Sequence, residues 1–217
     1  MLSRSIGTFI IQERSVWLHS SLDISALADH PNLRKNPNAT VRTIDELMSL
    51  DSSVTEIIID NGVGDWNFTV LDLSRFTRLR TLEIGNNSLC YVTTVNIIGL
   101  SALLSVKIGK NSFVWFYGVF RLKYCPLLMI LNINYGSFEH YTICEIEGTP
   151  AMLSIIIGDW KRYNFNFRSA FSLELKGACW RREWWIDMPL LNSLSFGPYA
   201  FQYCDRAVFE SDWSLCA

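Results

Sequence analysis

One short apolar pattern recurs five times along this chain and constrains its fold more than any other feature. In each copy, apolar residues alternate with polar ones and the copy ends at a glycine or asparagine. The copies are residues 79–85, 103–109, 128–134, 152–158 and 191–197. From Gly85 through Gly109 and Asn134 to Gly158, the steps are 24, 25 and 24 residues. A fixed period of this size predicts a solenoid, because one unit cannot bury its inner face until its neighbours stack on it.

Composition narrows the class of protein. Of the 217 residues, 49% are hydrophobic and 18% are charged, which excludes a largely disordered chain. The formal net charge of −2 gives no basic excess for nucleic acid, so none is expected as a partner. No apolar stretch is long enough for a membrane span, and no secretion signal is recognised. These features favour a cytoplasmic location, although the location stays unknown.

Each unit contains two short predicted strands. In the second strand of one copy, Val106 and Ile108 point inward while Ser105 and Lys107 point outward, the period of a β-strand. A first strand begins 14 positions before the glycine site in four copies. If the units stack as neighbouring turns, one inner position forms a continuous file, made of Leu82, Val106, Leu131 and Ile155.

Two further columns carry structural expectations. The glycine column suits a left-handed exit from the second strand, because glycine adopts positive φ at low cost. Its members are Gly85, Gly109, Gly158 and Gly197, with Asn134 in the third copy. Phe113, Phe138 and Phe201 share another repeat position and predict an aromatic stack in the core.

The ends of the array are predicted from local signals. Thr43 and Glu46 have capping-box spacing, which predicts a short helix from residue 44 to about 50 as an N-terminal cap. We therefore divide the chain into an N-terminal segment (1–42), a helical cap (43–53), a solenoid (54–210) and a C-terminal tail (211–217). The N-terminal segment either folds onto the cap or is partly disordered.

The best copies match the pattern L-x-x-L-x-L-x-x-N-x-L. They supply Leu79, Leu82, Ile84, Asn87 and Leu89 in one copy, and Leu103, Val106, Ile108, Asn111 and Phe113 in the next. The chain therefore resembles the leucine-rich-repeat family, and most of all its bacterial surface-antigen (BspA-like) class. The resemblance implies a mainly β solenoid with two short strands per ~24-residue turn, in which the asparagine amide satisfies backbone groups. The asparagine column stops after two copies, which favours a looser, two-faced β-solenoid.

Two long connections interrupt the period. Residues 159–170 are aromatic and basic and include Trp160 and Arg162, and residues 178–187 form a ten-residue insertion. Insertions in repeat arrays often lie on the binding face. The insertion supplies residue types enriched at interface hot spots, namely Trp180, Arg181, Arg182 and Trp184. The alternative is a lid of tryptophans that covers the core, and the same two interpretations apply to Trp115, Phe116 and Tyr117.

A second candidate contact lies on the outer face of the second strands. One outward column contains Glu83, Lys107, Asn132 and Ile156. Such a column suits a protein or peptide contact, or else consists of side chains that simply tolerate a crowded sheet. Glu83 and Lys107 on adjacent turns are candidates for a cross-strand ion pair.

No catalytic, cofactor or metal site is predicted. The three histidines occupy unrelated repeat positions, and no phosphate loop or metalloprotease motif occurs. Glu145 and Glu147 share a strand face, which we interpret as solvated. Among the six cysteines, Cys125 and Cys144 replace apolar residues and are expected to be buried reduced thiols, with an extracellular disulfide set as the alternative.

The sequence thus predicts a non-enzymatic protein–protein interaction module that uses the second-strand face and the long loops. Its partner would be a protein or peptide of unknown identity, and the oligomeric state stays open. The alternative is a structural or display array that is a fragment of a larger protein, because arrays of the family it resembles are commonly parts of larger proteins.

Overall fold

The structure is a computed structural model that describes residues 38–159, 164–176, 193–197, 200–204 and 206–210. The chain separates into two compact units, residues 1–36 and 37–217, and the description below concerns the second. The predicted tail at 211–217 lies outside the described residues, as does nearly all of the predicted segment at 1–42.

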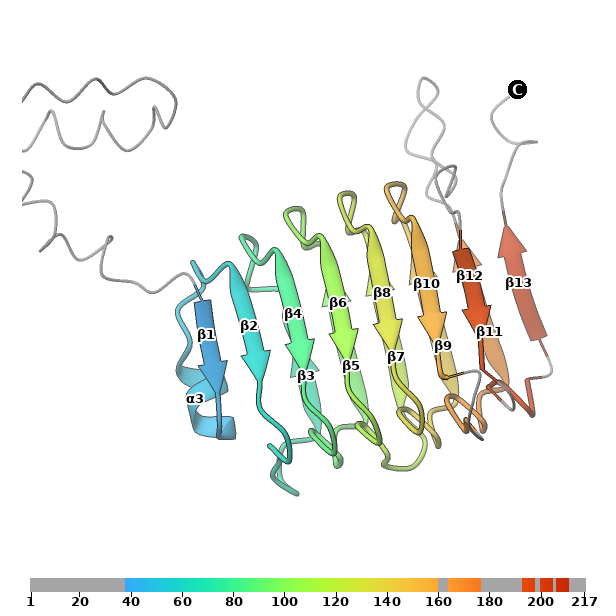
Figure 1. Ribbon diagram of the computed structural model, residues 1–217, viewed down its shortest axis with the longest axis horizontal. Coiled ribbons are helices and arrows are strands. Elements are labelled where there is room, and N and C mark those ends of the chain that lie inside the picture. Colours follow the sequence, from blue (N-terminus) through green and yellow to red (C-terminus); the bar gives the residue numbers. More distant parts are fainter. Residues whose placement is uncertain (1–37, 160–163, 177–192, 198–199, 205, 211–217) are drawn as a thin grey trace, which may run out of the picture. The chain divides into compact units, whose positions relative to one another are not determined.

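The second unit contains two parallel β-sheets joined turn by turn (Figure 1). Sheet A has seven strands: β1 (Asn38–Val41), β2 (Glu56–Ile59), β4 (Thr81–Ile84), β6 (Ser105–Ile108), β8 (Ile130–Ile133), β10 (Ser154–Ile157) and β12 (Ser193–Phe196). Sheet B has six: β3 (Val70–Asp72), β5 (Thr94–Ile98), β7 (Val119–Lys123), β9 (Ile143–Glu147), β11 (Ser172–Lys176) and β13 (Arg206–Glu210). The only described helix is α3 (Ile44–Ser49).

The predicted register of the second strands is confirmed. Leu82 lies opposite Val106, Val106 opposite Leu131, and Leu131 opposite Ile155 on successive strands of sheet A. All four side chains are buried. Along the strands, fully buried residues alternate with half-buried or exposed ones. Every turn therefore adds its apolar side chains to one continuous core, and the fold is a parallel β-solenoid of about five turns.

The predicted aromatic stack is present and contains one more ring than expected. The ring centroids of Phe113 and Phe138 lie 4.7 Å apart, with nearly parallel planes. Phe138 stacks on Phe167 at 4.9 Å, and Phe167 stacks on Phe201 at 5.1 Å. Phe167 escaped the sequence analysis because the long connection before it displaces it from the 24-residue period.

The glycine column has a different cause from the one predicted. Of its four glycines, only Gly158 has a positive φ, of 92°. At Gly85 a Cβ atom would lie 2.6 Å from the backbone nitrogen of Asn61, and at Gly109 it would lie 2.6 Å from the carbonyl carbon of Gly85. Glycine is therefore needed at Gly85 and Gly109 because adjacent turns approach closely. The expectation of positive φ was wrong at these two positions and also at Gly197 and Asn134.

Buried serines perform the task that the leucine-rich pattern assigns to asparagine. Asn87 and Asn111 are exposed, and both have a positive φ. Between adjacent turns, the Ser112 hydroxyl donates to the Gly85 carbonyl at 2.9 Å and accepts from the Ser88 amide at 3.2 Å. The Ser137 hydroxyl repeats both bonds one turn later. These hydroxyls satisfy backbone groups where the chain leaves sheet A, because unpaired buried groups are costly.

The N-terminal side of the unit contains one strand that the sequence analysis missed. Helix α3 occupies the predicted residues, and the Thr43 side chain accepts a hydrogen bond from the Glu46 amide at 3.2 Å. Before it, β1 pairs in parallel with β2 and forms the outer edge of sheet A. Sheet A therefore extends one strand beyond the predicted start of the solenoid at residue 54.

The two thiols predicted to be buried are buried. Cys125 and Cys144 are completely inaccessible and belong to the core. Burial raises the pKa of Cys125 to about 11 and raises the pKa of Cys144 well above 9.0. Both side chains therefore act as small apolar residues of the core at neutral pH, Cys144 within β9 and Cys125 just after β7.

Candidate functional site

The outward column of sheet A assembles as predicted. Glu83 lies opposite Lys107, Lys107 opposite Asn132, and Asn132 opposite Ile156. Glu83 and Lys107 are exposed, whereas Asn132 and Ile156 are half-buried between neighbouring turns. No ion pair within 4.0 Å joins Glu83 to Lys107 in the described structure, and both charged side chains are exposed to solvent.

The other predicted contact residues cannot be placed. They are Trp160, Arg162, Trp180, Arg181, Arg182 and Trp184, and all six lie outside the described residues. The choice between a contact loop and a tryptophan lid therefore stays as the sequence left it.

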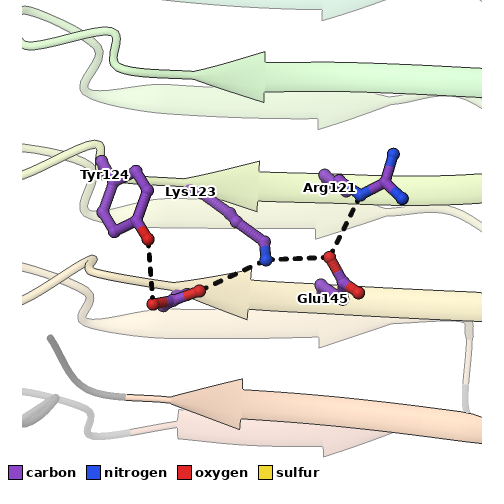
Figure 2. Close-up of polar contacts among 5 residues, drawn as sticks. Arg121, Lys123, Tyr124 and Glu145 are labelled. Atoms are coloured by element: carbon purple, nitrogen blue, oxygen red, sulfur yellow. Dashed lines mark hydrogen bonds and ion pairs between the residues drawn. The ribbon is translucent and has the colours of Figure 1, made fainter.

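The outer face of sheet B is a network of paired charges (Figure 2). The Lys123 Nζ lies 2.9 Å from Glu145 Oε2 and 3.3 Å from Glu147 Oε2. The Arg121 Nε lies 3.2 Å from the same Glu145 oxygen, and the Tyr124 hydroxyl donates to Glu147 Oε1 at 3.1 Å. Strand β9 thus supplies the carboxylates and β7 the cations.

These contacts raise the pKa values of Lys123 and Tyr124. Partial burial lowers the pKa of Lys123, but hydrogen bonds and attraction from Glu145 and Glu147 outweigh that effect and raise the pKa above 10.5. The hydrogen bond from Tyr124 to the Glu147 carboxylate raises the pKa of that phenol above 10.0. The two glutamates that the sequence placed on one face do share it, and both bind Lys123 there.

A cluster of exposed aromatic side chains lies on the loops that lead from sheet A to sheet B. We call it the aromatic rim, and it consists of the exposed Tyr91, Trp115, Phe116 and Tyr117 together with the half-buried His140. The ring centroids of Tyr91 and Trp115 are 5.2 Å apart, those of Trp115 and Phe116 are 6.1 Å apart, and Phe116 stacks on His140 at 4.4 Å. Phe116 is 54% exposed and Tyr117 is 82% exposed. These loops run along the lower edge of the solenoid in Figure 1.

One additional residue in the third loop creates most of this rim. In the regular loops, the first aromatic or apolar residue of the loop lies six positions before the first inward-facing residue of sheet B. Phe138 and Cys144 are an example. In the third loop, the equivalent residues Phe113 and Phe120 are seven positions apart. Because strand register is fixed on both sides, the extra residue must be absorbed in the loop. Phe116 and Tyr117 are consequently directed to the surface.

A tyrosine from the next turn fills the interior that Phe116 leaves. Tyr141 occupies the loop position equivalent to Phe116, yet its side chain is completely buried. Its hydroxyl donates to the Val92 carbonyl at 2.5 Å, two turns away. A Cβ atom at Gly118 would overlap the Tyr141 ring, so Gly118 supplies the necessary space.

The rim has one aromatic counterpart at the same repeat position in a later turn. That position lies two residues after Leu89, Phe113, Phe138 and Phe201 and holds Tyr91, Trp115, His140 and Tyr203, whereas the loop that contains Phe167 has Ser169 there. Tyr203 is 57% exposed, and Trp66, in the first loop, is 74% exposed. The sequence analysis left open whether residues 115–117 pack inward, and the structure shows them exposed. The signal that could have indicated this is the single 25-residue step between Gly109 and Asn134.

Known proteins provide no template for this site. No protein-family model, no curated protein and no solved structure matches the chain. Within the described ranges, no helix has the length and apolar character needed to cross a membrane. Nor do three or more histidine, cysteine, aspartate or glutamate side chains of the described residues gather as metal ligands would.

Proposed function

We propose that this solenoid is a non-enzymatic interaction module that binds a protein or peptide partner through the aromatic rim. The single observation that supports this is the set of contacting, exposed rings on three adjacent turns. Tryptophan and tyrosine are the residue types that dominate interface hot spots. Contiguous exposed apolar surface of this kind commonly marks a contact site.

The rim is held in place by backbone hydrogen bonds, which favours binding. The Tyr117 amide donates to the His140 carbonyl at 3.0 Å, and the Val119 amide donates to the Thr93 carbonyl at 2.8 Å. The third loop is therefore fastened to the turns on both sides. A preorganised surface loses less conformational entropy on association, so more of the gain from burying the rings appears as affinity.

The outward column of sheet A is the second part of the proposed contact surface. Glu83 and Lys107 offer exposed charges, and Ile130 and Ile156 offer apolar area beside them. Charges at the periphery of an interface increase specificity and the association rate more than they increase affinity. We therefore assign most of the binding energy to the aromatic rings and orientation of the partner to the column.

Affinity capture with the full chain tests this proposal. The double variant Trp115→Ala/Tyr117→Ala removes two exposed rings, and Phe171→Ala is the matched control because Phe171 is 50% exposed and lies outside the rim. Truncation of one hot spot costs about 2 kcal/mol or more, roughly 30-fold in Kd. We expect a partner that the wild type and the control both bind, and that the double variant binds at least 30-fold more weakly.

Two results would contradict the proposal. Equal capture by all three proteins would show that binding does not depend on the rim and would favour the display-array alternative. A double variant with a lowered urea midpoint would show that the rings stabilise the fold, as a packing role requires.

A further inference from the structure

Sheet B has a free edge at β3. Of the strands that the structure describes, β3 is the outermost in that sheet, and its one partner is β5 (Figure 1). On the β5 side, the Thr94 amide donates to the Thr69 carbonyl at 3.2 Å and the Leu73 amide donates to the Asn96 carbonyl at 3.1 Å. Because backbone groups alternate along a strand, those of Val70 and Asp72 point to the other side.

No strand of the described part of the chain lies on that other side. Among the described residues, neither Val70 nor Asp72 forms a backbone hydrogen bond across the free edge. Val70 is 49% exposed, while Thr94 and Val119, its equivalents in β5 and β7, are half-buried between neighbouring strands. Such an edge is a ready template for an additional strand.

A groove runs between this edge and helix α3. It has a volume of about 180 Å³ and is lined mainly by apolar side chains: Leu47 and Met48 from the helix, and Phe68, Val70, Leu71 and Phe76 from the other side. Arg75 fixes the helix beside the strand, because its Nη2 donates to the carbonyls of Leu47 and Met48 at 3.0 Å each. An apolar cavity of about 150 Å³ is enough for a benzene ring. The groove therefore has room for one large apolar side chain.

We propose that the β3 edge binds an extended peptide of a partner protein as an added strand of sheet B. The backbone of the peptide pairs with the outward groups of Val70 and Asp72, and one apolar side chain enters the groove. Strand addition beside a helix is a recurrent mode of peptide recognition, in which the backbone supplies affinity and pockets for alternate side chains supply specificity. The site is separate from the aromatic rim and does not depend on the function proposed there.

The register of sheet B defines the side chains of this peptide. Asp72, Asn96, Arg121 and Glu145 occupy one outward column on β3, β5, β7 and β9. In that column, Arg121 and Glu145 on adjacent strands already form an ion pair at 3.2 Å. A peptide strand beside β3 would therefore place a basic residue opposite the exposed Asp72, flanked by inward apolar residues.

Charge also distinguishes a foreign peptide from a second copy of this chain. If two β3 edges paired with each other, each would offer an aspartate and no basic residue to its partner. Like charges that face each other across strands are destabilising. A basic–apolar peptide satisfies the edge better.

The chain itself suggests a probe with this pattern. Residues 118–124 read Gly-Val-Phe-Arg-Leu-Lys-Tyr, and in β7 they alternate inward apolar residues with outward basic ones. We would titrate this peptide, acetylated and amidated, into the ¹⁵N-labelled full chain, with the Arg→Glu peptide as its charge control. We expect the amide signals of Val70 and Asp72 to shift and to gain protection from hydrogen exchange, with binding at least tenfold weaker for the control peptide.

Two protein variants complete the test. Val70→Pro removes the outward N–H at a position where proline is tolerated, since edge strands accept it, whereas Val70→Thr keeps the N–H and is the matched control. We expect at least tenfold weaker peptide binding for the proline variant and less than threefold for the threonine variant. Asp72→Lys should reverse the preference between the two peptides, and this readout holds even if Val70→Pro does not fold.

The proposal is overturned by any of three results. The first is equal peptide binding by a folded Val70→Pro variant and the wild type. The second is the absence of detectable peptide binding at 1 mM peptide. The third is a concentration-dependent dimer, detected by sedimentation, that protects the same two amides, because it would show that a second copy occupies the edge.

Discussion

The third and fourth loops between the two sheets differ by one residue and by the side on which their aromatic rings lie. In the fourth loop, Tyr141 is completely buried, whereas its positional equivalent in the third loop, Phe116, is 54% exposed. The strands on both sides of each loop keep the same register. The comparison shows that a solenoid can convert a core position into a surface position without disturbing its sheets.

Residues of the neighbouring turns adapt to this change. The Tyr141 ring lies against Gly118 of the third loop, and its hydroxyl reaches Val92 of the second. One insertion therefore produces both an exposed aromatic rim and a ring that joins three turns. Function and stability are coupled at this point of the array.

The largest expected effect contrasts Tyr141 with Phe116. We expect Tyr141→Ala to lower the free energy of unfolding by about 3–5 kcal/mol, the range for truncation of a buried aromatic side chain. Phe116→Ala, at an exposed position, should change it by about 0.5 kcal/mol or less. Urea denaturation of both variants measures this contrast, and similar losses in the two would break it.

An intermediate effect is expected at alkaline pH. Burial raises the pKa of Cys125 from 9.0 to about 11, so the thiol contributes stability that is fully present below pH 9.0 and is lost as pH rises to about 11. A shift of this size corresponds to about 2–3 kcal/mol. The unfolding free energy should fall across this window, and less steeply in Cys125→Ala. The same slope in both proteins would show that this thiol is not buried.

The smallest expected effect compares the outer faces of the two sheets. Lys123 contacts two carboxylates on sheet B, whereas Lys107 on sheet A has no ion pair within 4.0 Å among the described residues. We expect Lys123→Ala to cost about 1 kcal/mol and Lys107→Ala less than about 0.5 kcal/mol. High salt should reduce only the first value, which chemical denaturation with urea at two salt concentrations can measure.

The regular parts of the fold could be predicted from the sequence because apolar and polar residues follow a regular local spacing there. Leu82, Val106 and Leu131 were placed in one buried file, and Thr43 was placed at the start of a helix. Both features depend on local spacing in the sequence. The two-residue period of a strand and the position of a helix-capping residue can each be recognised from a few neighbouring residues.

The candidate site was harder to predict because it lies in loops, where alternation does not apply. The sequence could not decide whether Phe116 and Tyr117 point inward, since the answer depends on Tyr141 occupying the space from another turn. The prediction of positive φ for the glycine column was wrong for a similar reason, because the close contact of Gly109 with Gly85 arises only when turns stack. The free edge at β3 likewise appears only once the strand order is known.

A double-mutant cycle between Gly118 and Tyr141 tests the central claim most directly, because it asks whether the ring fills the space beside that glycine. Alone, Gly118→Ala should cost about 1–3 kcal/mol through overlap with the ring. In the Tyr141→Ala background the same change should cost close to nothing, which gives a coupling energy of about 1 kcal/mol or more. Gly64→Ala is the control, because a Cβ atom there meets only ordinary contacts, the nearest at 3.6 Å. Additive costs for Gly118→Ala and Tyr141→Ala would contradict the account.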